Sequence, residues 1–185
     1  MGSELNWGYV VTYLALGARH QRVRELNLVD MGVGGTIARN CNNNFLGFIP
    51  DEIGNLSQLR KIEMQDNELN GPIPTSLGFL ENLQKLNLSY NGLYGEVPNG
   101  IFNVSFFTAI DLKGNNLSGS LPTDICNNLP NIELLKFSYN QISGNIPPSL
   151  EACKKLQRFS QAYNAFSGSI PMEILNLDQS FELST

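Results

Sequence analysis

A repeated string of glycine, any residue, a hydrophobic residue and proline constrains the fold of this chain more than any other feature. It recurs at intervals of 24 or 25 residues, with its hydrophobic residue at Ile49, Ile73, Val97, Leu121, Ile146 and Ile170. An asparagine lies six residues before each of these positions, at Asn43, Asn67, Asn91, Asn115, Asn140 and Asn164. Such a period is typical of a solenoid, in which each unit is one turn of chain stacked on the next.

Ahead of five of these strings the chain follows the spacing apolar-x-x-apolar-x-apolar. The triplets are Leu59, Ile62 and Met64; Leu83, Leu86 and Leu88; Phe107, Ile110 and Leu112; Ile132, Leu135 and Phe137; and Leu156, Phe159 and Gln161. The alternation suits a short strand with one face inward, and the asparagine follows where the chain turns. We expect its side chain to bond backbone N–H and C=O groups that the turn leaves free, in a ladder from unit to unit. These roles account for much of the 26 leucines and 23 asparagines among 185 residues.

The segment LQKLNLSYNGLYGEVPNGIFNV matches the pattern of plant-type leucine-rich repeats, and the resemblance covers about residues 22–180. The segments GARHQRVRELNL, LPTDICNNLP and IPPSLEACKKLQ more narrowly resemble the ectodomains of plant receptor-like serine/threonine kinases. The resemblance implies an α/β fold: a right-handed leucine-rich repeat solenoid with a concave parallel β-sheet and 3-10 or irregular convex turns.

The sequence departs from this pattern near its beginning. Only 12 residues separate Ile37 from Ile49, half the usual period, which predicts a half-repeat deletion near residues 38–41. The strand near residues 24–28 should then stack directly on the strand near 61–65 or leave a defect between them. Gln161 occupies an inward position where an apolar residue is expected, which predicts a local weak point because a buried, unpartnered amide is costly.

The two ends of the chain lack the expected caps. Residues 1–21 form a degenerate N-terminal cap with a weakly signal-like segment, in which YVVTYLAL is expected to pair antiparallel with RVRELNL. The repeats occupy residues 22–180, and residues 181–185 are interpreted as a truncated C-terminal tail. These departures lead us to expect either a fragment or a decayed copy of a longer receptor.

Composition and motifs exclude several functions. A net charge of -5, with 12 basic residues that never form a run, argues against binding nucleic acid. No apolar stretch is long enough to span a bilayer, so no membrane contact by this segment itself is expected. His20 lacks catalytic partners, the run GVGGT lacks the lysine of a phosphate-binding loop, and kinase signatures are absent. We therefore expect no enzymatic activity, no cofactor and, without a C-x-x-C pair, no metal.

Candidate covalent modifications involve cysteine and asparagine. Cys126 and Cys153 lie on the convex side of adjacent repeats, where they form either a disulfide or two small buried thiols. Four N-x-S/T sequons occur, at Asn55, Asn87, Asn103 and Asn116. Asn55 and Asn103 share one convex position, two repeats apart, where a glycan is tolerated, whereas a glycan on Asn87 would obstruct the concave strand.

The residues between and after the inward strand positions must face outward on the concave sheet. They form columns: Lys61, Lys85, Ala109, Leu134 and Arg158; Glu63, Asn87, Asp111, Lys136 and Ser160; Gln65, Ser89, Lys113, Ser138 and Ala162; and Asp66, Tyr90, Gly114, Tyr139 and Tyr163. Their mixed charges and tyrosines suit contact with a peptide or protein, with these ligand-binding candidates: Lys61, Glu63, Gln65, Lys85, Ser89, Tyr90, Asp111, Lys113, Lys136, Tyr139, Arg158 and Tyr163. The alternative is a merely solvated strand face.

The leading functional hypothesis is a non-catalytic recognition module. The resemblance implies a fragment of an extracellular plant receptor-like kinase ectodomain in signalling or defence, at the outer face of the plasma membrane. Its partners would be a peptide or protein ligand and a co-receptor. Two alternatives stay open: a soluble protein similar to polygalacturonase inhibitors, and a non-functional truncated gene copy.

Overall fold

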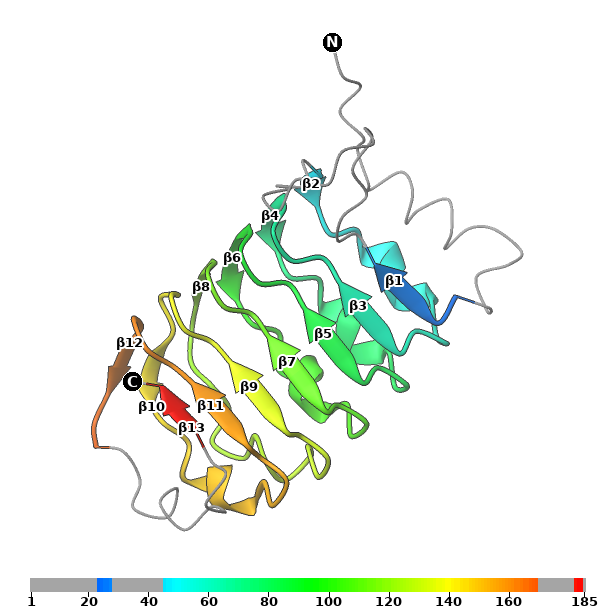
Figure 1. Cartoon of the computed structure of the whole chain (residues 1–185). Coiled ribbons are helices and arrows are strands. Elements are labelled where there is room, and N and C mark those ends of the chain that lie inside the picture. Colours follow the sequence, from blue (N-terminus) through cyan, green and yellow to red (C-terminus); the bar gives the residue numbers. More distant parts are fainter. Residues whose placement is uncertain (1–22, 28–44, 170–181, 185) are drawn as a thin grey trace.

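The computed structural model describes residues 23–27, 45–169 and 182–184. Successive turns of the chain stack side by side, so that strands far apart in the sequence lie next to one another (Figure 1). Each turn contributes a strand to one long parallel sheet. In most of the described turns the chain then passes through a second strand and a short 3-10 helix before it returns, whereas between β8 and β9 it has no 3-10 helix. This is the leucine-rich repeat solenoid that the period of 24 residues predicts.

The larger sheet contains seven parallel strands of three residues each. In spatial order they are β1 (Glu25–Asn27), β3 (Lys61–Glu63), β5 (Lys85–Asn87), β7 (Ala109–Asp111), β9 (Leu134–Lys136), β11 (Arg158–Ser160) and β13 (Glu182–Ser184). From β1 to β11 the middle residue is buried and its neighbours point outward. The inward residues predicted from the sequence are therefore the inward residues of the structure.

The second halves of the units form smaller sheets and 3-10 turns. Strands β2 (Leu46–Phe48), β4 (Glu68–Pro72), β6 (Gly92–Glu96) and β8 (Asn116–Ser118) pair in parallel, as do β10 (Ser143–Asn145) and β12 (Ala165–Ser167). The 3-10 helices are η2 (Asp51–Asn55), η3 (Thr75–Phe79), η4 (Asn99–Asn103) and η5 (Pro148–Ala152). Each follows a proline whose fixed φ ends the preceding extended segment.

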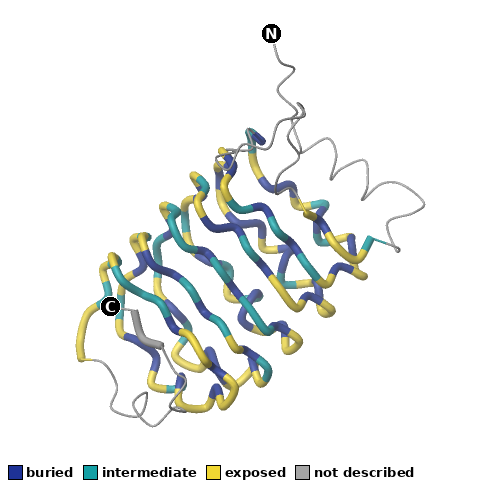
Figure 2. Tube along the Cα trace, viewed as in Figure 1, coloured by how far each residue is buried: buried dark blue, intermediate teal, exposed yellow. Residues whose placement is uncertain are grey.

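The core lies between the larger sheet and the 3-10 turns, and it runs along the solenoid (Figure 2). Leucine and isoleucine fill most inward positions, while Phe102, Phe107, Phe137 and Phe159 are its largest fully buried side chains. The ring of Phe137 lies 6.4 Å from the rings of both Phe102 and Phe159, so aromatic contacts link successive units. Because each unit buries its apolar face only against its neighbours, stability depends on stacking.

The turn asparagines form the ladder predicted from the sequence. The side-chain amide of Asn115 donates to the carbonyl oxygens of Leu112 and, one unit earlier, Leu88. Its side-chain oxygen accepts from the backbone N–H of Leu93, 3.1 Å away. Equivalent bonds recur at Asn67, Asn91, Asn140 and Asn164. The ladder satisfies backbone groups that a solenoid turn would otherwise bury unpaired.

The irregular spacing near the N-terminus does not interrupt the larger sheet. Strand β1 pairs directly with β3, with Leu26 opposite Ile62, although these residues are 36 positions apart rather than 24. Of the two expected outcomes, direct stacking is therefore the one found. The deletion itself, near residues 38–41, lies outside the described residues.

Gln161 occupies its inward position without being fully buried. The side chain is half-buried, and it is absent from the buried polar side chains that lack a partner in the described part of the chain. The buried, unpaired amide on which the expected weak point depends is therefore not found, and the effect of Gln161 on stability stays a prediction.

Of the two ends of the chain, residues 1–21 and 181–185, the structure describes a strand only at the C-terminal end. The predicted cap and its antiparallel hairpin, residues 1–21, lie outside the described residues. Within the expected tail of residues 181–185, β13 pairs with β11 and extends the larger sheet. No helix of the described segments has both the length and the apolar character needed to traverse a bilayer.

Candidate functional site

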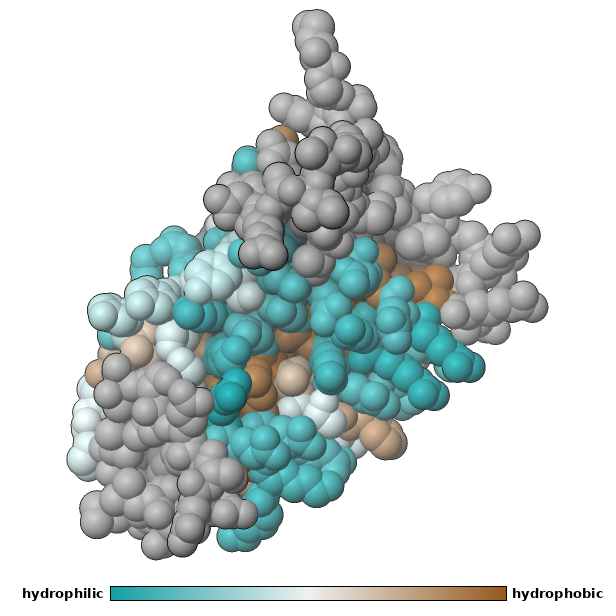
Figure 3. Space-filling view, viewed as in Figure 1, coloured by the Kyte–Doolittle hydropathy of each residue, from teal (hydrophilic) through white to brown (hydrophobic). Residues whose placement is uncertain are grey.

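The outward face of the larger sheet carries the predicted ligand-binding residues in the predicted columns. The strand register places Lys61, Lys85, Ala109, Leu134 and Arg158 side by side, and likewise Glu63, Asn87, Asp111, Lys136 and Ser160. Hydrophilic residues cover much of this face (Figure 3). We define the first and second columns as these two sets. The third and fourth columns are the sets of residues from Gln65 to Ala162 and from Asp66 to Tyr163 that follow the strands.

Ion pairs occupy part of the first two columns. Lys61 Nζ lies 2.9 Å from Glu63 Oε2, and the hydrogen bond to Glu63 raises the pKa of Lys61 above its usual 10.5. Lys136 Nζ lies 3.2 Å from Asp111 Oδ2, across neighbouring strands. Lys85 is exposed and has no ion pair among the described residues. Both pairs are half-buried and each keeps some contact with solvent, so they contribute only modest stability.

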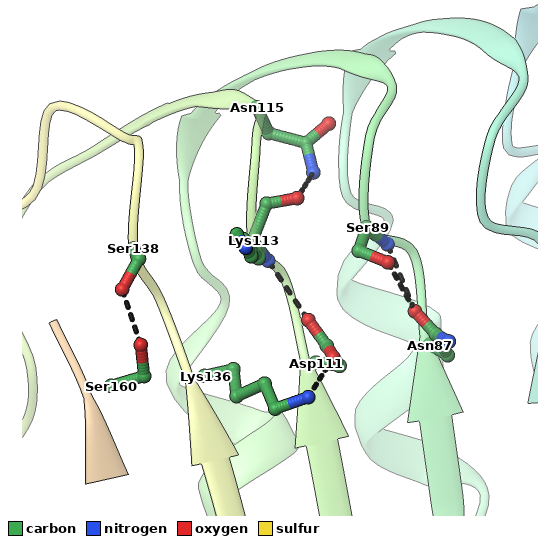
Figure 4. A network of polar contacts seen from close by, with 8 residues as sticks. All are labelled: Asn87, Ser89, Asp111, Lys113, Asn115, Lys136, Ser138 and Ser160. Atoms are coloured by element: carbon green, nitrogen blue, oxygen red, sulfur yellow. Dashed lines mark hydrogen bonds and ion pairs between the residues drawn. The ribbon is translucent and has the colours of Figure 1, made fainter. Parts of the chain in front are cut away.

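Short polar side chains at the strand ends fix the backbone that leads into the turns (Figure 4). Asn87 Oδ1 accepts hydrogen bonds from the N–H and the hydroxyl of Ser89, and Asp111 Oδ1 accepts from the N–H of Lys113. Such bonds to the residue two positions later stabilise a turn. Ser89 is only 5% exposed, so it supports the surface rather than contributing to it.

The fourth column has a left-handed backbone in every unit. The φ angles are 57° at Asp66, 54° at Tyr90, 69° at Gly114, 60° at Tyr139 and 56° at Tyr163. Glycine and aspartate adopt this conformation at lower cost than other residues, whereas tyrosine is a poor choice for it. The repeat geometry thus demands a conformation that the three tyrosines do not favour.

These tyrosines and one lysine form a continuous surface. The rings of Tyr139 and Tyr163 stack, with centroids 4.4 Å apart and planes inclined by 13°. Lys113 Nζ lies 5.3 Å from the centroid of Tyr90 and 5.4 Å from that of Tyr139, within the range of a cation–π contact. We call Tyr90, Lys113, Tyr139 and Tyr163 the tyrosine–lysine row.

The row depends on the glycine at its centre. A Cβ on Gly114 would lie 2.7 Å from Cδ1 of Tyr90, so the ring of Tyr90 occupies space that any other residue would fill. Hydrogen bonding to Tyr90 raises the pKa of Lys113, which keeps the ammonium charged. The sequence assigned Lys113 and the tyrosines to different columns and did not predict their contact. The single glycine in the fourth column was the one sequence feature that could have indicated this contact, because it leaves space for a neighbouring ring.

The remaining predicted residues differ in accessibility. Arg158 is exposed, whereas Gln65 is half-buried with Oε1 enclosed and unpartnered. Each of the four tyrosine–lysine row residues reaches the surface, with the three tyrosines 49%, 49% and 71% exposed. The accessible part of the predicted site is therefore concentrated in the first, second and fourth columns and at Lys113.

The convex side carries the cysteines and two of the sequons. Cys126 and Cys153 are buried and joined in a disulfide with their Cα atoms 5.1 Å apart. Asn55 ends η2 and Asn103 ends η4, and both are exposed, although Asn103 Oδ1 accepts a hydrogen bond from Asn128.

The other two sequon asparagines lie in strands. Asn87 is half-buried in β5, on the outward face of the larger sheet, and its side-chain oxygen is bonded to Ser89. Asn116 is exposed in β8 and accepts a hydrogen bond from Gln141. Across the segments that the structure describes, no group of three or more histidine, cysteine, aspartate or glutamate side chains is placed to hold a metal ion.

Comparison with known proteins agrees with this geometry. A family model described as Leucine Rich Repeat matches residues 82–104, 107–128 and 131–153. The plant peptide hormone receptor RGFR1, solved in complex with RGF2, is 39% identical with a TM-score of 0.73. The alignment covers 76% of this chain and 22% of that one.

Two structures of the Arabidopsis receptor kinase HAESA are also similar. Its ectodomain in complex with an extended IDA peptide hormone is 37% identical over 77% of this chain and 24% of that one, with a TM-score of 0.69. The complex of HAESA with IDA and the co-receptor SERK1 matches at 28% identity and a TM-score of 0.60, over 72% of this chain and 26% of that one. This chain thus spans about a quarter or less of the length of these neighbours.

The search of curated proteins found no match. A plant ice-binding protein also matches, at 28% identity and a TM-score of 0.65, over 71% of this chain and 41% of that one. The matched repeats and ectodomains are not catalytic domains, in agreement with the expectation that this chain is not an enzyme. The chain is a leucine-rich repeat solenoid of the kind found in the ectodomains of plant receptor kinases.

Proposed function

We propose that this chain is part of an extracellular receptor-kinase ectodomain that recognises a peptide or protein in signalling or defence, with a co-receptor as a further partner. The observation that carries the proposal is the exposed tyrosine–lysine row on a regular parallel sheet. Tyrosine gives a large contact area at low entropic cost, which favours it in binding surfaces. Structural neighbours with peptide hormones bound support the same role.

The disulfide and the sequons support a location outside the cell. A disulfide between buried cysteines is stable in an oxidising compartment and uncommon in the cytosol. We propose that Asn55 and Asn103 carry N-glycans, because both are exposed on the convex side and distant from the outward columns. Secretion from a eukaryotic host followed by glycopeptide mass spectrometry tests this; unmodified asparagine at both positions would contradict it.

Selection from a yeast-displayed library of random 12-residue peptides tests recognition by the sheet. Selected peptides should bind the secreted chain and lose binding to Ala109→Trp, which covers the first column at β7. Thr123→Trp places the same side chain on the convex surface and should leave binding unchanged. Failure to select any peptide, or equal binding to Ala109→Trp, would overturn the proposal.

Two further measurements separate the alternatives. Inhibition of a fungal polygalacturonase by the purified chain would favour a soluble inhibitor over a receptor segment. A cooperative thermal unfolding transition, followed by far-ultraviolet circular dichroism, would argue against a non-functional gene copy, because a decayed sequence loses its stacked core.

A further inference from the structure

Charge is distributed unevenly between the outward columns and the rest of the chain. The chain has 12 basic and 17 acidic residues and a net charge of -5. The four columns hold five of the basic residues but only three of the acidic ones, Glu63, Asp66 and Asp111. Glu25 of β1 and Glu182 of β13 extend the first column opposite Lys61 and Arg158, so the outward positions of the sheet hold five basic and five acidic residues. The net negative charge of the protein thus lies outside this face, which does not repel a negatively charged ligand.

The cation of the tyrosine–lysine row has no carboxylate partner within the described residues. Asp111 is the nearest acidic residue in sequence, but its Oδ2 pairs with Lys136 and its Oδ1 accepts from the backbone of Lys113. The Lys113 ammonium instead lies between the rings of Tyr90 and Tyr139. It is thus held in position, charged and open to an incoming anion.

The left-handed tyrosines provide an independent reason to assign a function to this row. The same position holds aspartate or glycine in two other units, so the turn does not require an aromatic residue. A left-handed conformation costs a residue with a Cβ roughly 1–2 kcal/mol, and such strain tends to collect at functional sites. Stacking of Tyr139 on Tyr163 offsets only part of this cost.

We propose that the tyrosine–lysine row binds an extended acidic peptide, with a ligand carboxylate on Lys113 Nζ and neighbouring ligand residues packed on the rings of Tyr139 and Tyr163. This inference rests on the proposed peptide-binding function and names the ligand class. Adjacent strands lie about 4.8 Å apart, so a row over four units spans roughly 15 Å, the length of four to five extended residues. A peptide rather than a free anion is favoured because an exposed lysine alone gives a carboxylate little affinity.

Sequencing of the peptides selected on the unmodified chain is the first test. Aspartate and glutamate should be enriched relative to lysine and arginine. Lys113→Gln should weaken binding of a selected acidic peptide about threefold to fivefold, which is the loss expected for one partly exposed ion pair. Lys154→Gln removes the same charge beyond η5, away from the sheet, and should leave the affinity unchanged.

A tyrosine variant separates binding from folding. Tyr139→Asn removes the ring, and asparagine tolerates the left-handed backbone at this position, so the variant should fold and bind at least fivefold more weakly. Circular dichroism confirms the fold. Equal affinity of both row variants for an acidic peptide, or selected peptides without acidic enrichment, overturns this inference while recognition by the sheet stands. The absence of any peptide sensitive to Ala109→Trp overturns the proposed function itself.

Discussion

At the scale of single residues, the turn asparagines bond the backbone of neighbouring units, and Gly114 leaves room for the ring of Tyr90. Both could be located from the period alone, but only the asparagine role was predictable in physical terms. An asparagine at each turn of a repeat implies backbone groups that need partners. The contact of Tyr90 with Lys113 depends on side-chain direction across two units, which periodicity does not encode.

Replacing Asn115 with alanine should lower the free energy of unfolding by about 1–3 kcal/mol, because it leaves the N–H of Leu93 without its partner. The carbonyls of Leu88 and Leu112 lose one of their two side-chain donors and keep the amides of Asn91 and Asn140. Urea denaturation measures the loss. Asn70→Ala, at an exposed position of β4, is the matched control and should change stability by less than about 0.5 kcal/mol. Equal losses for the two variants would show that the ladder contributes nothing specific.

Gly114→Ala tests the centre of the tyrosine–lysine row. The added Cβ clashes with the ring of Tyr90 and strains a left-handed backbone, so we expect a loss of about 1–2 kcal/mol and a displaced Tyr90. Urea denaturation measures the loss and nuclear magnetic resonance detects a displaced Tyr90. In Gly100→Ala the new Cβ meets Gly78 Cα at 3.5 Å, an ordinary contact, and little should change. A stable Gly114→Ala with unmoved Tyr90 resonances would contradict this account.

At the scale of elements, the strands of the larger sheet were predictable and the second sheet was not. Alternating apolar residues such as Ile62 and Met64 predict a strand with one buried face. No strand was predicted for the string around Gly71, although Leu69 and Gly71 are the two buried, inward residues of β4. Glycine in a strand position masked the alternation, because glycine and proline ordinarily signal a turn.

The disulfide links two convex segments 27 residues apart and should stabilise the C-terminal units. Chain-entropy arguments give roughly 3–4 kcal/mol for closing a loop of this length. Urea denaturation with and without dithiothreitol should show a loss of that order. In a variant with Cys126→Ala and Cys153→Ala, the reductant should not change the free energy of unfolding. Identical curves for the original chain would indicate that stacking alone fixes these units.

At the scale of the whole molecule, the proposed contact between the Lys113 ammonium and the carboxylates of an acidic peptide determines how binding should depend on pH. Hydrogen bonding to Tyr90 raises the pKa of Lys113 above its ordinary 10.5. The ammonium and its contribution to stability are therefore fully present below pH 10 and are lost only as the pH rises through that raised value.

Affinity for an acidic peptide should consequently be flat between pH 6 and 9. It should fall below about pH 4.5 as the ligand carboxylates become protonated, since their ordinary pKa values are about 4. It should also weaken with added salt, because the contact is exposed. Fluorescence anisotropy with a labelled acidic peptide measures both effects. A decline between pH 6 and 7 would point instead to a group other than Lys113.

Because β1 pairs directly with β3, the number of residues that connect two strands does not determine the register of the outward columns at this end of the solenoid. Glu25 and Asn27 continue the first and second columns opposite Lys61 and Glu63, despite the additional residues between the two strands. Insertions and deletions between strands therefore change the number of residues that connect two strands, but they do not change the spacing of the outward columns. Half a unit can be gained or lost between two strands while the outward columns keep their spacing.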